Sequence, residues 1–130
     1  MSTKLSITMI AILILAGIIA GAVVYPLLPE QVASHWNAND EVDGYMSRFW
    51  GVALMPLVTL GMAALFLVIP AIDPLKANIA QFRGAFNTFI VLITAFMLYI
   101  HGLTLAYNLG YTFRMSLALI PALGLIFVFA

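Results

Sequence analysis

Three long stretches of the sequence contain no charged residue. They cover 5–29, 49–72 and 84–113, and a fourth such stretch follows Arg114 up to Ala130. A helix needs about 20 apolar residues to cross the hydrocarbon core of a membrane, and lipid offers the backbone no hydrogen-bond partner, so each crossing segment must be helical. The chain is 65% hydrophobic and 8% charged, whereas soluble domains are about 25% charged. The bilayer is therefore the expected solvent.

These stretches predict an all-α, polytopic membrane protein with four transmembrane helices and one structured extracytoplasmic loop between the first two. The expected spans are 5–25, 49–72, 85–109 and 114–130, and the polar loop is 26–48. They form a single transmembrane domain. The last span is short for a complete crossing and has no polar flank after it. We therefore expect the chain to be part of a longer protein.

Lysine and arginine in the short loops predict the orientation of the chain in the cell membrane. Lys4, Lys76 and Arg83 lie on the N-terminal side, against two arginines on the other side. This balance favours a cytoplasmic N-terminus and an extracytoplasmic loop 26–48. The segment 20–22 reads Ala-Gly-Ala and resembles a signal-peptidase site. The apolar stretch before it is longer than the ~7–15 residues of a signal core, so we expect the first span to be retained.

Two local patterns concern the packing of the helices. Gly17 and Gly21 form a GxxxG pattern, which lets another helix backbone approach closely, and we expect it to serve packing within the chain. Between the second and third spans, Leu75, Ile79 and Phe82 fall on one helical face. This arrangement predicts a short helix at the membrane interface.

The polar loop has its centre in the stretch HWNANDEVDGYMSR, and half of the charged residues of the chain lie in the loop. Leu28, Val32 and Trp36 are spaced by four, which predicts a short amphipathic helix with Trp36 at the membrane interface. Asp43 and Gly44 form a dipeptide typical of tight turns. We therefore expect a helix followed by a turn.

The residues of this loop suggest two kinds of metal site. Residues 39–44 copy the first half of a calcium-binding loop, but Trp50 stands where a bidentate glutamate is required. His35 and the loop carboxylates offer nitrogen and oxygen ligands for zinc, although their spacing matches no diagnostic pattern. The carboxylates concerned are Glu30, Asp40 and Asp43. We expect a solvated, hydrogen-bonded loop and assign no cofactor.

His101 is the only readily ionisable side chain of the third span. An ionisable residue inside the membrane suggests a functional role. Thr94, Thr104 and Asn108 share one helical stripe with it, and this stripe should face the protein interior. His101 is then either a neutral histidine that is hydrogen-bonded across helices or a group that serves a ligand, a proton or a metal.

The loop also carries a family resemblance. Its elements are Leu28-Pro29, His35-Trp36-Asn37, Asp43-Gly44-Tyr45 and a basic residue, Arg48, before the next helix. In this order they resemble the N-terminal domain of unknown function of SdpI-family membrane proteins of bacteria and archaea. The resemblance implies a recognition or immunity module, which protects against a toxic peptide or holds a protein partner at the membrane.

The expected activity is thus binding rather than catalysis, because serines are few and neither histidine has an obvious nucleophile partner. The expected partners are the lipid bilayer and a peptide or protein; the zero net charge gives no reason to expect nucleic acid. The expected recognition residues are His35, Trp36, Asn37, Asp43, Tyr45 and Arg48, with His101, Thr104 and Asn108 as the intramembrane polar group. The alternative is a metal-dependent membrane enzyme or transporter component that uses His35, His101 and the loop carboxylates.

Overall fold

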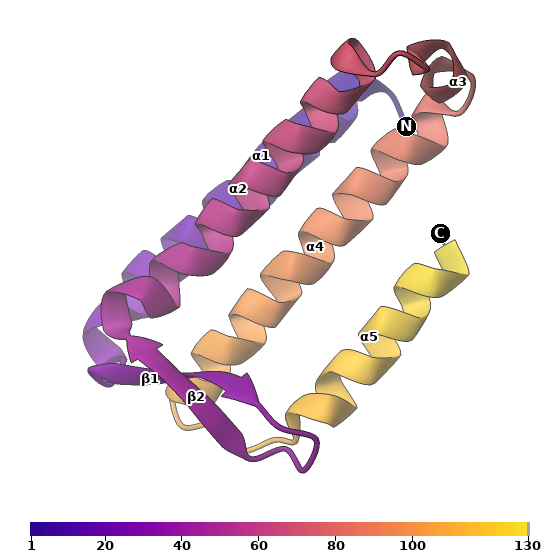
Figure 1. Cartoon of the computed structure of the whole chain (residues 1–130). Coiled ribbons are helices and arrows are strands. Elements are labelled where there is room, and N and C mark those ends of the chain that lie inside the picture. Colours follow the sequence, from indigo (N-terminus) through magenta and orange to yellow (C-terminus); the bar gives the residue numbers. More distant parts are fainter. Residues whose placement is uncertain (130) are drawn as a thin grey trace.

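The computed structural model describes residues 1–129 and shows a mostly helical chain with a small hairpin at one end (Figure 1). The four long helices are α1 (Thr3–Val24), α2 (Arg48–Ile72), α4 (Arg83–Asn108) and α5 (Met115–Phe129). The first three are long and apolar enough to cross a membrane, which makes this a multi-pass membrane protein. At 1.5 Å per residue, α5 is only about 22 Å long, shorter than the ~30 Å hydrocarbon core.

Helices occupy all four of the predicted stretches, with ends that differ by at most two residues where the structure describes them. The predicted fourth span is a shorter apolar helix, and its last predicted residue, 130, lies outside the described residues. The N-terminus and the connection between α2 and α4 lie at the end opposite the hairpin (Figure 1). Which end faces the cytoplasm stays a prediction.

The GxxxG pattern of α1 serves packing within the chain, as predicted. A Cβ atom on Gly17 would come within 2.9 Å of Leu98 Cδ2 in α4, and one on Gly21 would come within 3.1 Å of Val52 Cβ in α2. Both glycines are buried. The missing side chains thus allow α1 to lie close to both neighbouring helices.

Two clusters of buried apolar side chains hold the bundle together. The larger one lies between α1, α2 and α4 and consists of Ile10, Ile14, Ala63, Ile90 and Val91. The smaller one lies under the hairpin and consists of Leu28, Val32 and Leu105. Most of the other large apolar side chains are exposed. Exposed apolar surface of this extent fits a protein whose helices are surrounded by lipid.

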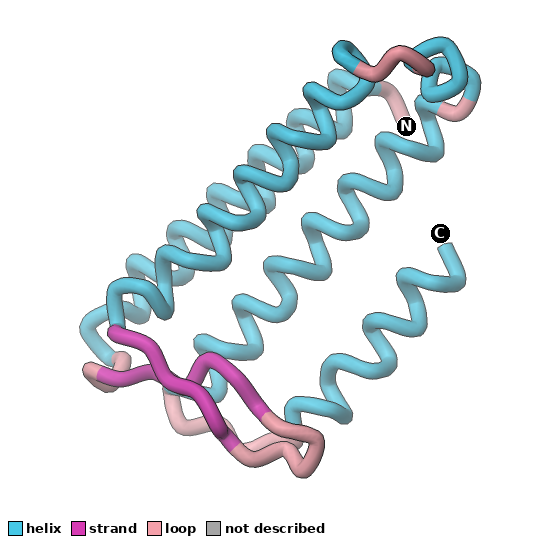
Figure 2. The backbone as a smooth tube through the Cα atoms, viewed as in Figure 1, coloured by secondary structure: helices cyan, strands magenta, loops and turns pink. Residues whose placement is uncertain are grey.

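The loop between α1 and α2 is a β-hairpin rather than a helix. After a short 3₁₀ turn, η1 (Tyr25–Leu27), the chain forms β1 (Gln31–Trp36) and β2 (Val42–Ser47), which pair antiparallel (Figure 2). The all-α prediction is therefore wrong in this loop. Residues four apart lie on one face of a strand, where side chains repeat every two residues. They also lie on one face of a helix, where one turn takes 3.6 residues. The strand forms because β2 supplies the backbone hydrogen-bond partners of β1.

The hairpin turn is also displaced from its predicted position at Asp43-Gly44, because both residues lie within β2. The turn is formed instead by Asn37 to Glu41, where Asn37 Oδ1 accepts hydrogen bonds from the backbone N–H groups of Asn39 and Glu41 at 2.9 and 3.0 Å. This is an asparagine-stabilised turn. Gly44 serves a close approach, since a Cβ there would lie 2.9 Å from a side-chain carbon of β1.

The predicted short helix is present as α3 (Lys76–Gln81), at the end of the bundle away from the hairpin (Figure 1). Its place at the membrane interface stays a prediction. Of its predicted apolar face, Ile79 is buried, whereas Leu75 and Phe82 are exposed. Asp73 Oδ1 accepts a hydrogen bond of 2.7 Å from the backbone N–H of Leu75 and so shapes the turn that precedes α3.

Gly51 of α2 provides a direct test of how the hairpin packs against α2. A Cβ atom at Gly51 would lie 2.2 Å from Val32 Cγ2 of β1. We predict that Gly51→Ala forces β1 away from α2 and destabilises the folded protein by about 1–3 kcal/mol, the usual range for overpacking. Thermal unfolding in detergent, followed by circular dichroism, measures the effect.

Gly61 is the matched control, because nothing lies within 4 Å of a Cβ built there on the same helix. Gly61→Ala should be neutral or stabilising by up to about 1 kcal/mol. Adding Val32→Ala to Gly51→Ala should recover part of the loss, because it removes the clashing methyl group. Equal effects of the two glycine substitutions would contradict this account.

Candidate functional site

Asn108, in the last turn of α4, holds the hairpin onto the bundle. Its Oδ1 accepts a hydrogen bond of 2.7 Å from the backbone N–H of Ala33, and its Nδ2 donates to the carbonyl oxygen of the same residue at 3.0 Å. Nδ2 also donates to the carbonyl oxygen of Thr104 at 2.8 Å. The side-chain amide therefore satisfies both backbone groups of a buried strand residue, as a third strand would.

Asp40 attaches the tip of the hairpin to the start of α5. Its Oδ1 accepts a hydrogen bond of 2.8 Å from the backbone N–H of Ser116, and its Oδ2 accepts from the Ser116 hydroxyl at 2.7 Å and from Arg114 Nε at 3.0 Å. The Asp40 side chain is only 9% exposed. A carboxylate at the N-terminus of a helix is also favoured by the helix dipole.

These contacts stabilise the charged form of Asp40. The hydrogen bonds from the Ser116 hydroxyl and backbone N–H, followed by those from Arg114, hold the pKa of the Asp40 carboxyl below its ordinary value of 3.8, although partial burial acts in the opposite direction. Asp40 has a positive φ of 62°. Aspartate and asparagine tolerate this backbone conformation better than most residues do.

Three of the predicted recognition residues lie on the exposed side of the hairpin. His35 Nδ1 contacts Asp43 Oδ1, and the two side chains are 72% and 43% exposed. Tyr45, two residues after Asp43 on β2, is 64% exposed. Residues two apart on a strand point to the same face. The sequence prediction of an accessible polar and aromatic surface thus fits the positions of these three residues.

The other three predicted recognition residues have partners within the chain. Trp36 packs edge-to-face against Tyr107 of α4, with ring centroids 5.1 Å apart. Asn37 forms the hairpin turn. Arg48 Nε donates to the carbonyl oxygen of Pro29 at 3.3 Å, and its guanidinium lies 5.7 Å from the centre of the Tyr25 ring. These residues build the hairpin rather than its outer surface.

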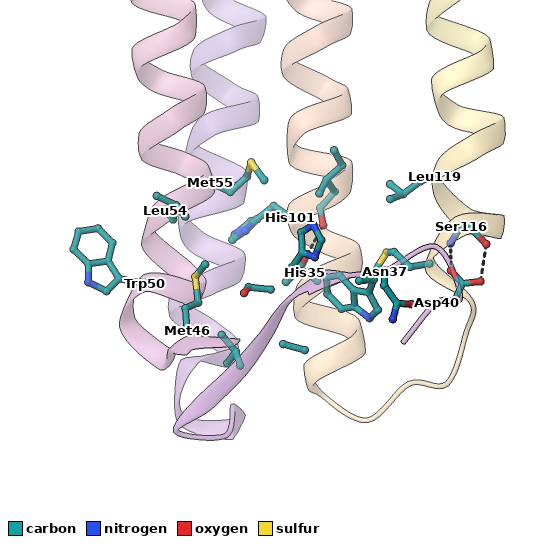
Figure 3. Close-up of a pocket in the computed structure, with 18 residues that line it drawn as sticks. His35, Asn37, Asp40, Met46, Trp50, Leu54, Met55, His101, Ser116 and Leu119 are labelled. Atoms are coloured by element: carbon teal, nitrogen blue, oxygen red, sulfur yellow. Dashed lines mark hydrogen bonds between the residues drawn. The ribbon is translucent and has the colours of Figure 1, made fainter. Parts of the chain in front are cut away.

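A cavity of about 360 Å³ lies beneath the hairpin (Figure 3). Its walls come from α2, α4 and α5, and β1 and the hairpin turn close one end. The lining residues include His35, Trp36, Met55, His101, Ser116 and Leu119. The volume falls in the ~300–1,000 Å³ range of small-molecule sites.

The intramembrane polar stripe faces the protein interior, as predicted. Thr94 is fully buried and His101 is 2% exposed, while Thr104 and Asn108 are half-buried. His101 lies against α1, where its Cδ2 would be 3.8 Å from a Cβ on Gly17. His101 and Thr104 line the cavity, and Asn108 lies nearer the hairpin, where it binds β1. The stripe thus connects the membrane-spanning part of α4 with the loop.

Sequence reasoning did not find the contact between Asp40 and Ser116, because 76 residues separate them. The available signal was the pairing of an acidic residue in the loop with Arg114 at the start of the last apolar stretch. The partner of Asn108 was equally hidden, since it is the backbone of Ala33. A contact with a backbone group cannot be predicted from the type of residue that supplies it.

Within residues 1–129, no group of three or more histidine, aspartate or glutamate side chains has an arrangement that could hold a metal ion. His35 and His101 nevertheless line the same cavity. The predicted use of both histidines in one site therefore has a geometric basis, although no three such side chains of the described residues lie close enough together to share a metal ion.

Part of the chain matches a protein-family model. Residues 12–60 match the family described as Domain of unknown function (DUF1648). The matched part spans the second half of α1, the hairpin and the first half of α2. Comparison with curated proteins and with solved structures gives no match.

The contact between Asp40 and α5 predicts a pH dependence. Because the folded-state pKa of Asp40 lies below 3.8, the stabilisation by its carboxylate is complete at pH values above the unfolded-state pKa. It is lost as the pH falls through the folded-state pKa. Spin labels at Ala38→Cys and Leu117→Cys, both exposed positions, would report the distance between the hairpin tip and α5. That distance should become broader on acidification from about pH 6 to about pH 2.

Asp40→Asn should give a broad distance distribution at every pH, because an amide cannot accept hydrogen bonds from Arg114 and Ser116 through two oxygens. Glu41→Gln, in the same turn, is the control and should behave like the unsubstituted protein. A pH-dependent distance that survives in Asp40→Asn would show that another group controls the contact.

Proposed function

We propose that the protein is an integral membrane recognition module of the SdpI type, which binds an amphipathic, cationic peptide at the outer surface of its hairpin. The observation that carries the proposal is the exposed group His35, Asp43 and Tyr45 on a hairpin that is fixed to the bundle. The resemblance of the loop to the SdpI family supports the same function. Immunity against a toxic peptide and signalling through a bound protein partner are the two biological roles that this resemblance implies.

The chemistry of the exposed group suits such a partner. Asp43 supplies a carboxylate for a lysine or arginine side chain, and Tyr45 supplies an amphipathic ring that contacts apolar groups at low entropic cost. His35 is held by Asp43, so its second ring nitrogen is left for a partner. The exposed carboxylate of Glu41 lies nearby in the turn. Acidic groups would also steer a cationic peptide toward the hairpin.

The rigidity of the surface supports binding without a large ordering cost. Asn108 holds β1, and Asp40 holds the turn. A preorganised surface loses less conformational entropy on association than a mobile loop does. The proposed orientation places the hairpin outside the cell, where a secreted peptide would meet it.

A binding assay tests this proposal. The purified protein in lipid nanodiscs would be titrated with a fluorescent synthetic peptide rich in lysine and leucine. The double substitution of His35→Ala and Asp43→Asn should weaken binding about tenfold, which corresponds to about 1.4 kcal/mol. It should also lower the salt dependence of binding, because one ionic contact is lost.

Two controls distinguish a loss of peptide binding at the hairpin from a general effect of substitution. Gln31→Ala changes an exposed residue of β1 without removing a charge. Asp73→Asn removes one carboxylate at the opposite end of the bundle (Figure 1). Both should bind the peptide like the unsubstituted protein. Unchanged binding by the double variant, or equal weakening by Asp73→Asn, would count against recognition at the hairpin.

The alternative proposal is a metal-dependent membrane enzyme or transporter component, and the observation in its favour is that His35 and His101 line one cavity. It predicts that protein purified without chelator contains about one zinc ion per chain, with each histidine substitution reducing this content. Elemental analysis by mass spectrometry of His35→Ala and His101→Ala measures this. A metal content far below one ion per chain, with no thermal stabilisation by added zinc, would refute the alternative.

A further inference from the structure

We propose that the cavity beneath the hairpin is a separate binding site, which takes an acyl chain and its ester carbonyl from a membrane lipid. This site does not depend on peptide recognition at the outer surface. It is formed by β1 and the hairpin turn together with α2, α4 and α5, and it shares His35 with the outer surface.

The lining of the cavity changes from polar to apolar with distance from the hairpin. Near β1 and the hairpin turn the lining includes Ser34, Asn37 and Ser116, the last of which starts α5. Further into the bundle the walls are formed by Met55 of α2 and Leu119 of α5, which flank the cavity in Figure 3. A polar end and an apolar depth match a molecule with one polar group and one hydrocarbon chain.

The size of the cavity suits a hydrocarbon chain. Its volume of about 360 Å³ lies in the range of small-molecule sites. A helix with side chains is about 10–12 Å wide, whereas a single hydrocarbon chain has a much smaller cross-section.

The cavity also contains hydrogen-bonding groups that lack a protein partner. Trp36 Nε1 and His101 Nε2 are buried, and neither has a hydrogen-bond partner among the described residues. Both side chains line the cavity. The indole N–H can only donate, so its partner must be an acceptor, and an occupant of the cavity would reach this buried atom after a small movement of the Trp36 ring. An ester carbonyl is such an acceptor and carries no charge into the apolar depth.

The position of Trp36 near the end of α4 suits contact with a lipid carbonyl. It packs on Tyr107, in the last turn of α4, where the membrane-spanning part of the helix ends. Tryptophan and tyrosine rings gather at the boundary between hydrocarbon and head groups. A lipid with its carbonyl at this level would place its chain beside Met55 and Leu119.

The walls of the cavity are helices that already face lipid. Leu57 of α2 is 54% exposed and Leu117 of α5 is 63% exposed. The cavity is therefore bounded by helices whose outer apolar side chains would contact the bilayer.

Tryptophan fluorescence tests this proposal. In a Trp50→Phe protein, Trp36 is the only tryptophan. The protein would be placed in nanodiscs of an ether-linked phosphatidylcholine with increasing fractions of an ester-linked phosphatidylcholine that carries a nitroxide close to its carbonyl. Quenching of Trp36 should saturate at a low fraction of labelled lipid, and excess unlabelled ester-linked phosphatidylcholine should reverse it. Quenching that rises only in proportion to the labelled fraction would overturn the proposal.

Cavity-filling variants locate the site. The combined change of Met55→Phe and Leu119→Phe should raise the half-saturating lipid fraction at least about fivefold, because overpacking excludes the chain. Leu57→Phe with Leu117→Phe is the matched control on the exposed faces of the same helices and should have no effect. Equal curves for both pairs would refute binding in the cavity.

Two further measurements separate lipid from peptide. Asp43→Asn, which should weaken peptide binding, should leave the lipid curve unchanged. Addition of the lysine- and leucine-rich peptide should leave Trp36 quenching by lipid unchanged as well. Displacement of the labelled lipid by that peptide would assign the cavity to the peptide and overturn the proposal.

Discussion

The double hydrogen bond between the Asn108 side chain and the backbone of Ala33 is the contact on which the outer end of the molecule depends. An isolated two-stranded hairpin is marginally stable. Here the amide of Asn108 takes the place of a third strand, and Gly51 leaves room for Val32 to pack against α2. Through Asn108, a polar residue at the end of a membrane-spanning helix determines where the exposed groups of the hairpin lie.

The helices could be predicted from the sequence more fully than the hairpin could. Long uncharged stretches in lipid satisfy their backbone hydrogen bonds by forming helices, so the helices and the packing role of Gly17 and Gly21 could be predicted. The four-residue spacing of Val32 and Trp36 suits both a helix and a strand. Only pairing with β2, which is a tertiary contact, decides between them. The glycine of the Asp43-Gly44 pair serves a close approach to β1, and residue type alone does not distinguish this role from a turn.

The candidate site was predictable in its residue types and less so in their roles. The interior position of His101 follows from the cost of a polar group in lipid. The split of the six loop residues into an exposed group and a structural group depends on which partners the fold supplies. Arg48 and Trp36, for example, have the same interfacial character as Tyr45 but contact Pro29 and Tyr107 instead.

The two proposed binding surfaces share β1, and this has a consequence for how they would influence each other. His35 is exposed, while its neighbour Trp36 packs on α4. Ligands at two sites influence each other only where both favour one conformation of the protein over another. Asn108 already holds Ala33 of the same strand through two hydrogen bonds. A strand held in this way leaves little conformational freedom for either ligand to remove, so lipid and peptide should bind independently.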